Sequence, residues 1–135
     1  MELALGNRYE LRFVVEYRHS AASIGSGGLE LLATPYMIAM MEGASFYCVE
    51  DRLPADKTTV GTLVDIKHLA ATPIGAEVVA TSELVEIDGR RLRFRVEARD
   101  AEDLIGEGYH ERFIVETERF LNKLGDKDQR ITQSK

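Results

Sequence analysis

The sequence predicts an α+β fold in which a five-stranded antiparallel sheet packs around one long helix. Three observations predict it. Several segments have the alternating or apolar patterns of strands, one longer apolar segment has the start and stop signals of a helix, and short turns join most of the later strands. The length of 135 residues is that of one domain, so we expect residues 1–135 to fold as a single unit.

The first strand is predicted at Tyr9–Arg18, where apolar residues alternate with polar ones. The next segment, His19–Glu30, is expected to be a loop because Gly25–Gly28 is rich in glycine. Glycine-rich backbone is mobile, and mobile segments of this kind often form lids over binding sites.

The helix is predicted to begin at Thr34 and Pro35, since threonine is a good N-cap and proline suits the first helical position. It should run to about Arg52, where Leu53-Pro54 ends it, and be about 27 Å long. The segment is apolar nearly all round, so we expect it to be buried. A cystatin-like α+β fold is the competing geometry, but the packing helix of that fold keeps a solvated face.

Four more strands follow, at Thr58–Leu69, Glu77–Ile87, Arg90–Arg99 and Leu104–Thr117. Asp88-Gly89 is a strong hairpin signal between the second and third of these. The polar residues from Gly125 to Lys135 are expected to form a frayed tail.

Glu42 is the only charged residue between Pro35 and Val49. Burial of an ionised carboxylate without partners costs much free energy, so carboxylates placed in this way are candidates for functional sites. The alternative is a structural carboxylate held by a partner, or one on a narrow exposed stripe.

His68 and Thr34 are further candidates. His68 shares a strand face with Val64 and Ile66, the face that should meet the helix, although a histidine there is often only structural. Thr34 could be only a helix cap. Thr34 and Glu42 are eight positions apart, which is about 12 Å along a helix, so their side chains cannot touch on one straight helix. Either the chain before Pro35 folds back, or a second protomer completes the site.

Basic residues form a ridge on one face of a predicted strand: Arg91, Arg93, Arg95 and Arg99. The ridge is either a solvated sheet face or a dock for a polyphosphate. The last strand places four residues in one register: Gly106, Gly108, His110 and Arg112. Glycines inside a strand often mark the close approach of a helix or a ligand.

Composition argues against several classes of protein. The net charge of −6 disfavours a nucleic-acid partner, and no apolar stretch reaches the length of a membrane span. No secretory leader is expected from Met1–Gly6, and the single cysteine, Cys48, excludes an internal disulfide. We therefore expect a cytoplasmic protein. No His, Cys and Asp cluster has metal-ligand spacing, so neither a metal nor another cofactor is expected.

Six segments together carry a resemblance to a known family: Ala33-Thr34-Pro35, Met40 to Ala44, Val60-Gly61-Thr62, His68 with Ala70 to Gly75, Asp88 to Leu92, and Gly108 to Arg112. They resemble the hot-dog-fold thioesterases, in particular the group that includes fluoroacetyl-CoA thioesterase. The resemblance extends over roughly Leu32 to Leu124. It implies a sheet wrapped around one central helix, and a homodimer with its sites at the interface.

The resemblance also implies an enzyme that hydrolyses a short-chain acyl-CoA to the free acid and CoA. Its catalytic residues would be Thr34, Glu42 and His68, and its substrate-binding residues Gly61 and Arg112. We expect His68 to act as general base, while Glu42 orients His68 or attacks the thioester itself, and Thr34 positions or carries the nucleophile.

Other expected roles concern binding. The Gly61 amide would donate to the oxyanion, and Arg112 would neutralise charge, with Arg91 and Arg93 as candidate phosphate ligands. Two alternatives stay open: a non-catalytic module that binds acyl-CoA or an acyl carrier, and a hot-dog hydratase or dehydratase. The segment Ile24–Gly28 lacks the aromatic side chains of members specialised for fluoroacetyl-CoA, so a narrow preference for that substrate is not expected.

Overall fold

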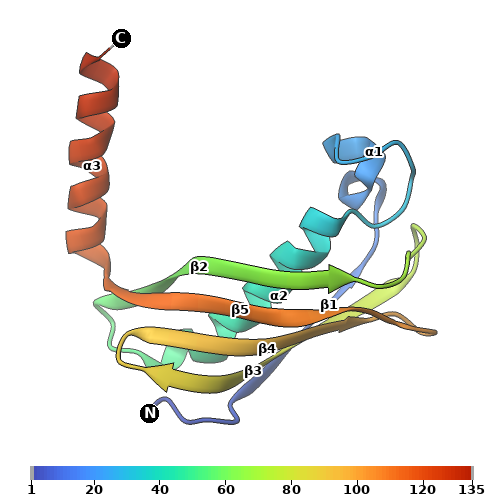
Figure 1. Ribbon diagram of the computed structural model, residues 1–135, viewed down its shortest axis with the longest axis horizontal. Coiled ribbons are helices and arrows are strands. Elements are labelled where there is room, and N and C mark those ends of the chain that lie inside the picture. The colour runs from blue at the N-terminus through green and yellow to red at the C-terminus, as the bar shows by residue number, and fades with distance from the viewer. Residues whose placement is uncertain (1, 135) are drawn as a thin grey trace.

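The computed structural model describes residues 2–134 (Figure 1). The strands are β1 (Arg8–Val14), β2 (Lys57–His68), β3 (Glu77–Asp88), β4 (Arg91–Arg99) and β5 (Leu104–Glu116). The helices are α1 (Ala21–Ile24), α2 (Thr34–Val49) and α3 (Thr117–Gln133), and short 3₁₀ turns span Tyr17–His19 and Glu50–Arg52.

The five strands form one antiparallel sheet in the order β1-β3-β4-β5-β2, and α2 packs on one face of it (Figure 1). Strand β4 alternates between fully buried and partly buried residues, and Leu92, Phe94 and Val96 are fully buried against the helix. The predicted α+β fold is confirmed. Strands β1 and β2 are the two edges of the sheet.

The first strand is shorter than predicted. It ends at Val14, and Tyr17–His19 form a 3₁₀ turn because the backbone N–H of Glu16 donates to Nδ1 of His19 at 2.9 Å. The predicted loop that follows contains the short helix α1, which begins where the side chain of Ser20 accepts from the backbone of Ser23.

Helix α2 begins at Thr34, the predicted N-cap, rather than at Pro35, and ends at Val49 rather than at about Arg52, because Glu50–Arg52 tighten into a 3₁₀ turn. Ala33 is the N-cap with extended backbone, and Thr34 is already helical. The buried residues Met37, Met41, Cys48 and Val49 lie on one face, whereas the opposite face, with Ile38, Met40, Phe46 and Tyr47, keeps exposed surface. The sequence predicted a helix that is buried on every side, but in a single chain only the side that faces the sheet is buried.

Strand β2 contains a bulge that sets the orientation of its functional residues. Gly61 pairs with Arg112 and Leu63 with Glu111, so Thr62 is an extra residue between them. Because facing residues of paired antiparallel strands point to the same side of the sheet, the bulge places Gly61 on the same face as Val64 and the residues that alternate with it.

The glycines of β5 allow the close approach that the sequence predicted. A Cβ at Gly106 would lie 2.6 Å from Sδ of Met37 on α2, and a Cβ at Gly108 would lie 2.0 Å from the backbone oxygen of Asp65 on β2. Neither position has room for a side chain. The helix and the edge strand therefore pack directly against the backbone of β5.

The prediction of a frayed tail from Gly125 is wrong over residues 125–133. Helix α3 runs through it and extends away from the sheet (Figure 1). Phe120, Leu124 and Ile131 share one helix face, and that pattern outweighs the helix penalty of a single glycine, which is about 1 kcal/mol. No residue of α3 is buried in the chain.

Candidate active site

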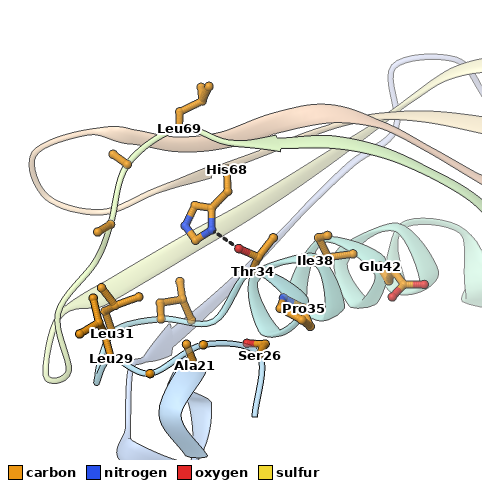
Figure 2. Close-up of a pocket in the computed structure, with 15 residues that line it drawn as sticks. Ala21, Ser26, Leu29, Leu31, Thr34, Pro35, Ile38, Glu42, His68 and Leu69 are labelled. Atoms are coloured by element: carbon orange, nitrogen blue, oxygen red, sulfur yellow. Dashed lines mark hydrogen bonds between the residues drawn. The ribbon is translucent and has the colours of Figure 1, made fainter. Parts of the chain in front are cut away.

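A cavity of about 940 Å³ opens between α2, the end of β2 and the loop that follows α1 (Figure 2). Its lining includes Thr34, Ile38, Glu42 and His68, which come from helix and strand. The loop contributes Ser26, Gly27, Gly28 and Leu29. The structure therefore places the glycine-rich segment beside the predicted catalytic residues, as a lid requires.

Thr34 and His68 are in direct contact. Oγ1 of Thr34 lies 2.7 Å from Nδ1 of His68 (Figure 2). Thr34 makes no capping hydrogen bond to the helix, whose N-cap is Ala33. The structure thus excludes the alternative that Thr34 serves only as a cap, and confirms that His68 faces the helix.

His68 is suited to act as a base. Burial lowers the pKa of His68 below its ordinary value, an effect that the nearby backbone at Ala70 partly opposes. The ring is therefore neutral at pH 7, and an unprotonated Nδ1 can accept the proton of the Thr34 hydroxyl. Nε2 of His68 is inaccessible and has no hydrogen-bond partner among residues 2–134.

Glu42 lies on the same side of α2 as Thr34 and Ile38 (Figure 2), since residues four apart on a helix share a face. Thr34 and Glu42 both belong to the one helix, two turns apart. The chain before Pro35 therefore does not fold back to join them. The Glu42 carboxylate is half-buried rather than buried, and forms no hydrogen bond or ion pair within the described part of the chain.

A polar cluster surrounds Gly61, opposite Glu42. A Cβ at Gly61 would lie 3.1 Å from Oε2 of Glu42, 3.3 Å from Cε1 of His110 and 3.4 Å from Nη1 of Arg112. The bare backbone of Gly61 is therefore the point at which these three side chains meet. A side chain at Gly61 would crowd all three groups, so glycine allows them to approach the backbone of β2.

His110 and Arg112 are buried beneath this point. Nδ1 of His110 lies 2.8 Å from the carbonyl of Leu63 at the bulge, so it is the protonated nitrogen, and Nε2 accepts from Nη1 of Arg112 at 3.2 Å. Arg112 also donates to Thr59 Oγ1 at 2.7 Å and to the Thr59 carbonyl at 3.0 Å. These bonds hold the guanidinium in one position.

Electrostatics in this cluster follow from burial. Burial lowers the pKa of His110, which is consequently neutral, and also lowers the pKa of Arg112, although Glu42 and Glu50 oppose that second shift. No carboxylate among residues 2–134 forms an ion pair with Arg112. The site thus has a buried positive charge available to a negative substrate group.

The arginine ridge lies elsewhere. Arg91 and Arg93 contact Glu111 at 2.9 and 2.6 Å on the sheet face opposite α2, and neither lines the cavity. Arg95 pairs with Glu107. This arrangement favours the alternative of a solvated sheet face over the predicted phosphate dock.

Sequence reasoning left His110 without a role and missed Ile38. The contact of His110 with the bulge carbonyl had no signal in the sequence, but the spacing of Thr34, Ile38 and Glu42 could have identified Ile38. Over residues 2–134, no three His, Cys, Asp or Glu side chains gather as metal ligands would, and no helix has both the length and the apolar character to cross a membrane.

Comparison with known proteins agrees with this geometry. The family model of fluoroacetyl-CoA-specific thioesterase matches residues 14–118. The fluoroacetyl-CoA thioesterase of Streptantibioticus cattleyicolor is 40% identical over 98 residues, which are 73% of this chain and 70% of that protein.

Solved structures agree as well. The fluoroacetyl-CoA thioesterase FlK matches with a TM-score of 0.88 at 33% identity, over 94% of this chain and 98% of that one. A hot-dog-like protein from Thermanaerovibrio acidaminovorans has the same fold, with a TM-score of 0.86 at 20% identity over 93% of each chain. The chain therefore has the predicted hot-dog fold and belongs to the fluoroacetyl-CoA-specific thioesterase family.

Proposed function

We propose that the chain is an acyl-CoA thioesterase that hydrolyses a short-chain acyl-CoA to the free acid and CoA. The observation that carries this proposal is the 2.7 Å contact between Thr34 and His68, inside a cavity that Glu42 also lines. A hydroxyl beside a neutral imidazole is the arrangement of an activated nucleophile. The relatives, which are named as fluoroacetyl-CoA thioesterases, support the same chemistry.

In the proposed reaction, Oγ1 of Thr34 attacks the thioester carbonyl carbon while Nδ1 of His68 takes the hydroxyl proton. The C–S bond then breaks, and the CoA thiolate leaves with that proton. Water next adds to the acyl-threonine ester and gives a proton to His68, which returns it to Oγ1 as the free acid departs. Two other routes use the same residues: Glu42 attacks to form a mixed anhydride, or His68 activates water directly.

Stabilisation of charge in the transition state is assigned to the cluster around Gly61. Gly61 lies beside Glu42 and does not line the cavity of its own chain, so the amide of Gly61 of the second copy would donate to the oxyanion. Arg112 would neutralise negative charge near the acyl or pantetheine end, because it is buried without an ion-pair partner in the described chain. The reaction uses water alone, so we propose no metal and no cofactor.

The acyl specificity is proposed to be broad among short chains. The cavity lining includes small and aliphatic residues, such as Ala21, Leu29 and Ile38, but no aromatic side chain from the described residues. Without a bulky aromatic side chain in the cavity wall, the fluorine atom of a fluoroacetyl group makes few favourable contacts that the hydrogen atom of an acetyl group does not make. We therefore expect weak discrimination between fluoroacetyl-CoA and acetyl-CoA.

A homodimer is part of the proposal. Strand β2 is an unpaired sheet edge on which Leu63 and Val64 are 40% and 45% exposed, and one face of α2 is incompletely covered. A second copy that pairs with β2 would satisfy the free backbone groups and cover this apolar surface. Sedimentation that shows only monomer at micromolar concentration would contradict this arrangement.

The test of the activity is thiol release from a panel of acyl-CoAs, followed with a thiol reagent. Wild-type protein should release CoA from short-chain substrates, and Thr34→Ala protein should release it about 10²-fold more slowly or not at all. Binding of acyl-CoA without release would favour a non-catalytic module. Hydration of an enoyl-CoA without release would favour a hydratase.

A further inference from the structure

A group of positively charged side chains lies at the end of the sheet opposite α1, where β5 leads into α3 (Figure 1). Arg90, Arg119 and Lys123 line a cavity of about 300 Å³, together with Val115, Glu116 and Phe120. An adjoining cavity of about 200 Å³ shares Arg90 and adds Lys57. We call this group the α3 cation cluster: Lys57, Arg90, Arg119 and Lys123.

Backbone structure brings these residues together. Gly89 adopts positive φ in the turn between β3 and β4, and the Arg90 carbonyl then accepts from the N–H of Ile114 at 2.8 Å, which fixes the turn beside β5. Arg119 and Lys123 are four residues apart and share a face of α3. The cluster is thus built from three elements and is not a chance feature of one helix.

The positive charges of the α3 cation cluster are not neutralised by neighbouring carboxylates in the described chain. None of its four residues forms an ion pair within residues 2–134, in contrast to Arg91, Arg93 and Arg95 of the ridge. Its larger cavity has three cations against the single carboxylate of Glu116. Phe120, at the same cavity, is 40% exposed and offers an aromatic face. Unpaired cations beside an exposed aromatic ring are suited to a phosphorylated nucleotide.

We propose that the α3 cation cluster binds the nucleotide end of the CoA thioester, with phosphates on Arg90, Arg119 and Lys123 and the base against Phe120. This proposal rests on the proposed thioesterase function. It assigns to this cluster the phosphate contacts that the sequence assigned to the arginine ridge. The neutralised ridge cannot gain much from a phosphate, because its arginines already have carboxylate partners.

The cluster would serve the catalytic residues of a second copy. Lys57 and His68 are the two ends of β2, about 36 Å apart at ~3.3 Å per residue, which exceeds the reach of the pantetheine arm. Antiparallel pairing of β2 with its own copy about the strand centre places Lys57 next to the other copy's His68 end. The cation cluster of one copy then lies beside the acyl site of the other.

The first experiment compares two substrates that differ only in the nucleotide, acyl-CoA and the matching acyl-pantetheine. Wild-type protein should prefer acyl-CoA in kcat/KM. The double variant Arg119→Ala/Lys123→Ala should lose at least about tenfold of that preference, through KM for acyl-CoA. The matched control is Lys127→Ala/Arg130→Ala, which removes the same two charges from α3 outside the cavity and should keep the preference. An unchanged preference in the first variant, or an equal loss in the control, would overturn the proposal.

Direct binding separates this proposal from the thioesterase function. Adenosine 3′,5′-bisphosphate should bind wild-type protein in calorimetry, with an affinity that falls with salt and is lost in Arg119→Ala/Lys123→Ala. Absence of binding to wild-type protein overturns the cluster even if thiol release is found. Absence of thiol release from every acyl-CoA refutes the function, whatever the cluster binds.

Mixed dimers test the second copy's contribution. Thr34→Ala chains lack the nucleophile, and Arg119→Ala/Lys123→Ala chains lack the cluster. If the cluster serves the other copy, a mixed dimer contains one site with both parts intact, and co-expression should restore the acyl-CoA preference. If the two parts act within one chain, no site in the mixture is intact, and the preference stays lost.

Discussion

Substitution of Thr34 by alanine separates chemistry from stability. Because the N-cap is Ala33 and Thr34 makes no capping bond, the loss of about 1 kcal/mol that follows removal of a threonine cap should not occur. What is lost is the hydrogen bond to His68, worth about 1 kcal/mol or less at an exposed position. In a domain of this size, that lowers Tm by a few degrees at most.

Activity should respond very differently. Removal of the hydroxyl takes away the group that lies 2.7 Å from the proposed base, so kcat for acyl-CoA should fall about 10²-fold or more. Thr34→Ser keeps the hydroxyl and should keep most of the activity. The assay is thiol release at saturating substrate, with thermal unfolding of each variant in parallel.

Two results would refute this reasoning. Near wild-type kcat in Thr34→Ala protein would remove the hydroxyl from the chemistry and leave Glu42 or water as the nucleophile. A loss of activity that merely follows a large loss of stability would return Thr34 to a structural role. The serine variant distinguishes the second outcome, because it removes the methyl group of Thr34 but keeps the hydroxyl that bonds His68.

Three further predictions concern the neighbouring groups. Glu42→Gln should keep the fold, since the carboxylate is half-buried without an ion pair in the described chain, and should lower kcat about 10²-fold in the thiol-release assay. Retention of full kcat would exclude Glu42 from catalysis. His110→Phe keeps the ring but leaves a donor of buried Arg112 and the Leu63 carbonyl without partners, so urea unfolding should show a loss of about 1–3 kcal/mol. A neutral result would mean that water replaces these bonds. Burial lowers the pKa of His68 and His110 below 6.5, so the unfolded chain binds protons that the folded chain does not. The free energy of unfolding should therefore be highest above pH 6.5 and fall as pH drops through the folded pKa values, and a flat stability profile from pH 7 to 5 would contradict this statement. The kcat/KM should fall in acid as His68 becomes protonated, and a value that stays constant with falling pH until the protein unfolds would contradict the role of His68 as base.

The alternation of apolar residues and the turn and helix-start residues were enough to predict most of the fold. The alternation in the strands, the hairpin at Asp88-Gly89 and the proline at the start of the helix are local signals, and each is found in the structure. Helix α3 was missed because Gly125 and the polar composition outweighed the spacing of its apolar residues. That spacing was a sufficient signal, since Phe120, Leu124 and Ile131 fall on one helix face.

The site was predictable only in part. The isolated Glu42 and the strand face of His68 can be derived from the residues, but the contact between His68 and Thr34 depends on how β2 approaches the start of α2. The pairing of Arg91 and Arg93 with Glu111 depends on strand register, which a single sequence does not define. Apart from Ile38, whose spacing on the helix was a local signal, contacts between segments far apart in the chain account for what sequence reasoning missed in the site.

The bulge at Thr62 makes the length of β2 matter more than its composition. Gly61 and His68 are seven residues apart, an odd separation that would put them on opposite faces of a regular strand. A substitution at Thr62 leaves the count unchanged, and deletion of Thr62 would leave an even separation of six that keeps both residues on one face of a regular strand. Deletion of any other residue between Gly61 and His68, with the bulge kept, would turn one of the two to the outer face of the sheet. A copy of this site on a hot-dog scaffold with a regular strand must therefore either include the bulge or shorten the spacing between Gly61 and His68 by one residue.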